Sequence, residues 1–126
     1  MKQITREWIE QADRDLAMAI RESKVRREPN LRQACFLCHE SAEKFLKGCL
    51  IEAGAEFPRT HDLGRLLDLL TPSNVFAEAW RQQLSVLDAF SVNVRYPEGT
   101  VLPSDVHIAI RAAKFIRNQV RTYLGE

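Results

Sequence analysis

The chain has 126 residues, which is enough to bury the core of one domain, residues 1–126, without metal or disulfide support. Its 45% hydrophobic and 28% charged residues are ordinary for a globular protein, and a net charge of +1 excludes a global attraction to nucleic acid or to an anionic membrane. No apolar run approaches the roughly 20 residues of a membrane span. No signal peptide pattern follows Met1, so we expect a cytoplasmic protein that does not enter a membrane.

The first predicted helix covers about residues 5–26. One face of it repeats at steps of three and four residues, through Trp8, Ala12, Leu16, Ala19 and Ser23. Pro29 cannot continue a helix and ends this segment. The second predicted helix begins after the N-cap Asn30 and ends near Ala53, before Gly54. Its predicted core stripe is Leu31, Cys35, Cys38, Ala42, Phe45 and Cys49.

A short third helix is predicted after the cap Thr60, closed by Pro72. It carries four leucines, Leu63, Leu66, Leu67 and Leu70. A fourth helix follows Ser73 or Asn74 and ends at Pro97. Its expected buried face is Phe76, Trp80, Leu84, Leu87, Ser91 and Val94.

The fifth helix is predicted to begin at the cap Ser104. Its inward residues are expected to be Ile108, Ala112, Phe115, Ile116, Val120 and Tyr123. No segment shows sustained strand alternation. The sequence therefore predicts an all-α, up-and-down bundle of four long helices plus one short helix.

The three cysteines are an odd number within one predicted helix, which fits reduced thiols. Cys35 and Cys38 have the spacing of zinc ligands, but no second pair accompanies them. Cys49 lies on the same apolar stripe. We therefore interpret all three as core residues, and we predict no metal site and no cofactor.

Two polar patterns lie on the second helix. Arg32 and His39 are seven positions apart, hence nearly on one face, and could act as a cation and a general base. The alternative is a histidine at the core boundary and an exposed arginine. Further along, Glu40 precedes Lys44 and Glu43 precedes Lys47 by four residues, which predicts two ion pairs on a solvated face. Lys44 and Lys47 could instead reach a ligand, but these pairs neutralise them.

His61 and Asp62 stand at the predicted start of the third helix, where free amides could favour a phosphate. They could also bind a metal, or Asp62 could simply belong to a capped turn. Arg95 and Tyr96 precede Pro97. Arg95 could fork onto a phosphate while Tyr96 stacks on a base; alternatively, Arg95 caps a helix end and Tyr96 packs inside.

The fifth helix offers a local basic stripe, which is either a phosphate-binding surface or a solvated helix back. Its members are His107, Arg111, Lys114, Asn118 and Arg121, with Arg117 beside them. No glycine-rich loop of the dinucleotide or Walker type is present, so a nucleotide would have to be held by side chains.

Three motifs, in this order, resemble the HEPN family of small helical domains: residues 36–47 (FLCHESAEKFLK), 60–63 (THDL) and 93–98 (NVRYPE). The resemblance extends from about residue 8 to residue 124. It implies nucleotide or RNA binding, with Arg95 and Tyr96 as contacts and with Glu43, Lys47, His61 and Asp62 lining the site. It also implies a homodimer that acts with a minimal nucleotidyltransferase, in a toxin–antitoxin or defence-type system.

RNase members of the family carry an arginine followed by a histidine four to six residues later. No histidine follows Arg95 at that distance, and the next one is His107. Catalytic residues are therefore unknown. A non-catalytic dimerisation or protein-interaction module is the alternative function, and a metal-independent RNase is the second alternative.

Overall fold

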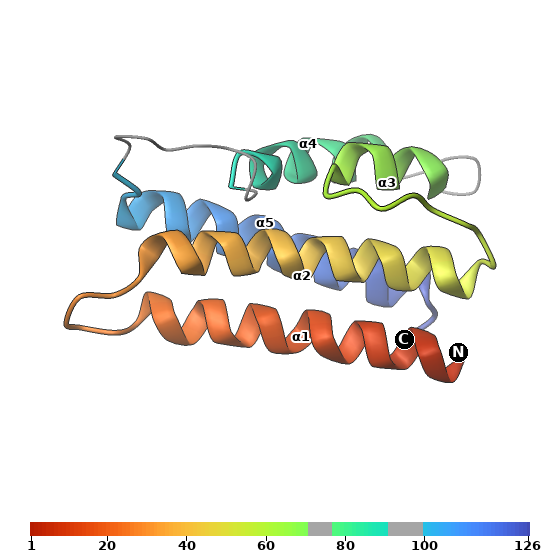
Figure 1. Ribbon diagram of the computed structural model, residues 1–126, viewed down its shortest axis with the longest axis horizontal. Helices are drawn as coiled ribbons and strands as arrows, with labels where there is room; N and C mark the ends of the chain where they lie inside the picture. The colour runs from red at the N-terminus through yellow and green to blue at the C-terminus, as the bar shows by residue number, and fades with distance from the viewer. Residues whose placement is uncertain (71–76, 91–99) are drawn as a thin grey trace.

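The computed structural model describes residues 1–70, 77–90 and 100–126. These contain five helices and no strand: α1 (Gln3–Ser23), α2 (Leu31–Glu52), α3 (Leu63–Leu70), α4 (Ala77–Asp88) and α5 (Pro103–Tyr123). The three longest, α1, α2 and α5, run along the length of the molecule, and the shorter α3 and α4 lie on the side opposite α1 (Figure 1). The predicted all-α bundle is confirmed.

Helix α2 begins and ends where the sequence predicts. The side chain of Asn30 accepts a hydrogen bond from the backbone N–H of Gln33 at 2.9 Å, which is an ordinary N-cap. At the other end, Gly54 adopts a φ of 71°, and the N–H of Ala55 donates to the carbonyl of Leu50 at 2.9 Å. A residue without a Cβ takes that left-handed conformation at little cost, so the chain can turn away here.

Other helix boundaries differ from the prediction. Helix α1 ends at Ser23, whose hydroxyl donates to the carbonyl of Ile20 at 2.6 Å. Helix α4 ends at Asp88 and is followed by a turn, so it stops well before the predicted end. Several residues that the sequence analysis used for boundaries and for the buried face lie outside the described residues: Pro72, Ser73, Asn74, Phe76, Ser91, Val94 and Pro97.

Helix α5 starts at Pro103 rather than after a Ser104 cap. The carboxylate of Asp105 accepts a hydrogen bond from the N–H of Leu102 at 2.8 Å, which satisfies the backbone just before the helix. The prediction that Ile108 faces inward is wrong, because it is 47% exposed. The buried face of α5 instead contains three alanines and three β-branched residues: Val106, Ala109, Ala112, Ala113, Ile116 and Val120.

Helix α2 occupies the centre of the bundle and packs against α1, α5, α3 and α4. Its approach to α1 is close at Gly48, where a Cβ would come within 2.9 Å of Ile9 Cδ1. The indole N–H of buried Trp80, on α4, donates to Gln119 Oε1 on α5 at 3.1 Å. Within the described residues, no helix has the length and apolar character that crossing a membrane requires.

Candidate functional site

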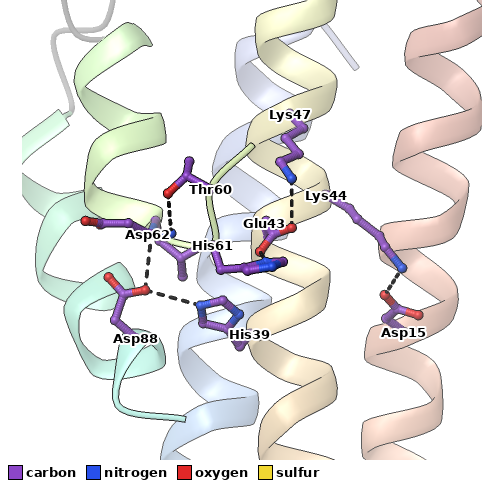
Figure 2. A network of polar contacts seen from close by, with 10 residues as sticks. Asp15, His39, Glu43, Lys44, Lys47, Thr60, His61, Asp62 and Asp88 are labelled. Carbon is purple, nitrogen blue, oxygen red and sulfur yellow. Dashed lines mark hydrogen bonds and ion pairs between the residues drawn. The ribbon is translucent and has the colours of Figure 1, made fainter. Parts of the chain in front are cut away.

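Glu43 is the centre of a polar network between α2 and the start of α3. Its side chain is only 5% exposed, and its two oxygens have different partners. Lys47 Nζ donates to Oε2 at 2.9 Å, and His61 Nδ1 lies 2.8 Å from Oε1 (Figure 2). Because a buried carboxylate is costly without such partners, both contacts stabilise the folded chain.

Lys47 is held on several sides. The predicted pair with Glu43 is confirmed, but it lies in the interior rather than on a solvated face, since the lysine side chain is 12% exposed. Its ammonium also lies 6.0 Å from the ring centre of Trp8 and 5.8 Å from that of Phe57. Aromatic faces attract a cation at such distances. Lys47 therefore meets a ligand only by leaving part of this cage.

His61 is the member of the network that reaches solvent, with 52% of its side chain exposed. Its neighbours fix the turn that presents it. Thr60 Oγ1 accepts from the N–H of Asp62 at 3.1 Å, and Asp62 Oδ1 accepts from the N–H of Arg65 at 3.1 Å. Asp62, rather than Thr60, is thus the residue that caps α3, because its carboxylate accepts from a backbone N–H in the first turn of the helix.

A second histidine joins three helices from inside. His39 is 1% exposed, and its Nε2 lies 3.2 Å from Asp88 Oδ1 at the end of α4. The same oxygen accepts from the N–H of Leu63 at 3.2 Å. His39 Nδ1 is buried and has no partner in the described part of the chain. The interpretation of His39 as a boundary residue is wrong, and its burial separates it from the exposed Arg32.

The expected pair between Glu40 and Lys44 is not formed. Lys44 Nζ instead donates to Asp15 Oδ2 on α1 at 2.6 Å. Glu40 makes no ion pair with any described residue. Burial, and then the nearby carboxylate of Glu43, raise the pKa of Glu40 above its ordinary value, and the neighbouring cationic groups oppose this only in part.

The structure therefore brings Glu43, Lys47 and His61 together, with Asp62 next in sequence but engaged in capping. Arg95 and Tyr96, the two contacts expected first, lie outside the described residues. Asp15 and Asp88 were missed by the sequence analysis. Both are single aspartates on helices, and no local pattern distinguishes them from surface carboxylates.

The basic stripe of α5 is largely solvent-exposed. His107, Arg111 and Lys114 are exposed, whereas Arg121 donates to Asp13 Oδ2 on α1 at 2.7 Å. Part of the stripe's charge is thus neutralised within the chain. The remaining cations form a second candidate surface for an anionic partner.

Known proteins share this fold and this sequence pattern. The sequence model of the HEPN domain family matches residues 5–123. The crystal structure of ST0689, an archaeal HEPN homologue, is similar with a TM-score of 0.76 and 31% identity, over 98% of this chain and 98% of that one. TT1696 from Thermus thermophilus shares the fold, with a TM-score of 0.77 and 24% identity over 96% and 98% of the two chains. No curated protein matches the sequence. This chain belongs to the HEPN family.

Proposed function

We propose that this HEPN domain binds a nucleotide or RNA at the surface around His61. The supporting observation is the contact between His61 and Glu43, in which a buried carboxylate holds an exposed imidazole at 2.8 Å. When Nδ1–H donates to Glu43, Nε2 is left for a ligand. That nitrogen accepts a hydrogen bond from a ribose hydroxyl when the ring is neutral and donates a hydrogen bond to a phosphate when it is protonated.

The other groups of this site supply charge and stacking. Lys47 donates to the other oxygen of the same carboxylate, so a phosphate near His61 gains a second nitrogen contact only when Lys47 leaves part of its cage. Arg95 and Tyr96 complete the proposal as the phosphate fork and the stacking ring. With no His at catalytic spacing after Arg95, we propose that the domain alone binds rather than cleaves RNA.

The test is a binding titration with labelled ATP, labelled GTP and a short single-stranded RNA. We expect His61→Ala to weaken binding about tenfold, which corresponds to about 1.4 kcal/mol. His107→Ala is the matched control, because it removes an exposed imidazole from α5 and should leave affinity unchanged. Absence of binding by the wild-type chain would contradict the proposal. Loss of RNA binding in His107→Ala, with His61→Ala unaffected, would move the contact to α5.

The partners are also proposals: a second copy of the chain and a minimal nucleotidyltransferase, acting in a toxin–antitoxin or defence-type system. Membership of the HEPN family supports them. Co-expression with a small nucleotidyltransferase encoded beside this gene tests the second partner, and co-elution is the expected result. If no such gene is adjacent, or the two proteins elute apart, this partnership is rejected.

A second candidate function is a protein-interaction module. Several large apolar side chains remain on the surface, namely Ile4 and Met18 on α1, and Leu102 and Ile108 at the start of α5. Where such side chains form a contiguous patch, they mark a docking surface. Nucleotide titration separates the two functions, because a pure interaction module binds neither ATP, GTP nor RNA.

A further inference from the structure

The imidazole of His39 is oriented by a carboxylate on one side and has an unpaired nitrogen on the other. Nε2 lies 3.2 Å from Asp88 Oδ1, so it carries the hydrogen and donates to that oxygen. Nδ1 then presents a lone pair, yet it is buried without a hydrogen-bond partner among the described residues. Such an unpaired buried group is rare in folded proteins and calls for a ligand or another explanation.

Two carboxylates lie beside this ring. His39, Glu40 and Glu43 each bring one potential ligand atom to a position within 4.8 Å of the other two. Glu40 has no ion pair in the described part of the chain and is only half-buried, so the cluster is reachable from solvent. Two neighbouring carboxylates repel each other, and a cation between them removes that repulsion.

We propose that His39, Glu40 and Glu43 bind a divalent transition-metal ion, with Asp88 as the positioning residue that holds the histidine. A metal-binding histidine commonly donates its other ring N–H to a carboxylate, and Asp88 stands in that place (Figure 2). One imidazole with two carboxylates suits ions such as Mn²⁺, Zn²⁺ or Co²⁺, with water in the remaining positions. The site goes beyond the proposed nucleotide binding and does not depend on it.

Binding has a consequence for the neighbouring network. Glu43 already serves Lys47 through Oε2 and His61 through Oε1. An ion that binds one of these oxygens displaces the side chain bonded to it. When the ion binds Oε2, its positive charge takes the place of the Lys47 ammonium beside Glu43.

The cysteines are the competing metal ligands on α2. Cys35 and Cys38 have ligand spacing, but both are buried, and neither has a histidine or carboxylate partner in the cluster above. A thiol must lose its proton to bind a metal, and burial in apolar surroundings opposes that loss. Any test must therefore distinguish oxygen and nitrogen ligands from sulfur.

The experiment is a Co²⁺ and Zn²⁺ titration of the full chain after treatment with a chelator, followed by visible and near-ultraviolet absorption. We expect one ion per chain and no thiolate-to-cobalt charge-transfer band. Glu40→Gln should weaken Co²⁺ binding at least about tenfold, since it removes one ligand while keeping the side-chain shape. Glu52→Gln, the same change near the end of the same helix, should leave the affinity unchanged.

Asp88→Asn addresses the positioning role. We expect it to weaken Co²⁺ binding by about 10–100-fold and to alter the visible spectrum of the bound ion, because a neutral amide is a weaker acceptor for the ring N–H than a carboxylate. A strong charge-transfer band would place the ion on the cysteines and overturn the proposal. So would wild-type binding weaker than about 1 mM, or equal affinity in Glu40→Gln and the wild type.

Discussion

Glu43 illustrates how much depends on a single buried side chain. It is nearly enclosed and has two partners, a mostly buried lysine in an ion pair and the ring nitrogen of a half-exposed histidine. We expect Glu43→Gln to lower the free energy of unfolding by roughly 3 kcal/mol, because Lys47 then keeps a buried charge without its counter-ion. His61→Ala should cost less than about 1 kcal/mol, since that partner is exposed. Urea denaturation of the two variants measures the difference, and equal losses would contradict this assignment.

Arg95 carries the prediction that best separates binding from stability. If Arg95 is a phosphate ligand, Arg95→Ala should leave Tm nearly unchanged and should sharply weaken nucleotide or RNA binding. Arg95→Lys should restore binding only in part, because an ammonium cannot form a two-pronged contact. Thermal melts and titrations of the three proteins decide it. A fall in Tm without a specific binding defect would instead make Arg95 a helix cap or an interior ion-pair partner.

The residue contacts differ in how far the sequence predicts them. Glu43 and Lys47 are four apart on one helix, so their pairing follows from helix geometry alone. The contact from His61 to Glu43 spans 18 residues, and that from His39 to Asp88 spans 49. The first contact depends on the path of the chain between α2 and α3, and the second depends on where α4 ends. Sequence periodicity predicts neither.

At the scale of the elements, the existence of each helix was predictable but its ends were less so. Asn30 and Gly54 mark the ends of α2 because each has a distinct backbone role. The sequence predicts Thr60 as the cap of α3, whereas the hydrogen bond from the N–H of Arg65 shows that Asp62 caps it. Helix α4 ends at Asp88, whose side chain contacts His39 on α2 and accepts from the backbone N–H of Leu63 on α3. The end of α4 is therefore tied to contacts with the neighbouring helices, which its own sequence does not contain.

The cysteines of α2 are buried, as predicted, and their burial makes the folded protein less stable at high pH. Burial raises the pKa of Cys35 to about 11 and those of Cys38 and Cys49 to about 12, from an ordinary 9.0. Folding therefore favours the protonated thiols. Their contribution is complete below pH 9.0 and is lost as pH rises toward 12, because the unfolded chain releases these protons first.

Two measurements check the burial of the thiols and the loss of stability at high pH. Stability to urea should decline above about pH 9, and the three thiols should react slowly with a thiol reagent at about pH 8 until the chain unfolds. Cys38→Ser should destabilise the fold by about 1–3 kcal/mol, because it places a hydroxyl among apolar neighbours. Fast labelling of all three thiols in the native protein would contradict their burial.

At the scale of the whole molecule, we expect a homodimer. A single chain with a net charge of +1 has few cations to spare for a polyphosphate, and several of them already serve internal ion pairs. Two-fold pairing is the commonest oligomer and would bring two copies of the site together. Light scattering at micromolar concentration and above tests this expectation. A mass of one chain throughout would refute it.

The central position of α2 also bears on the order in which the molecule comes apart. Every other helix packs against it, and its own length is buried from Ala34 to Leu50 except on one narrow side. Fluctuations that detach α3 or α4 leave the α1–α2 contact intact, whereas exposing the amides of α2 requires the whole bundle to separate. Native-state hydrogen exchange should therefore find the slowest amides around Phe45 and Leu46, exchanging only at the global unfolding free energy. Amides of α4 should exchange through smaller openings, and equal rates in the two helices would argue against this hierarchy.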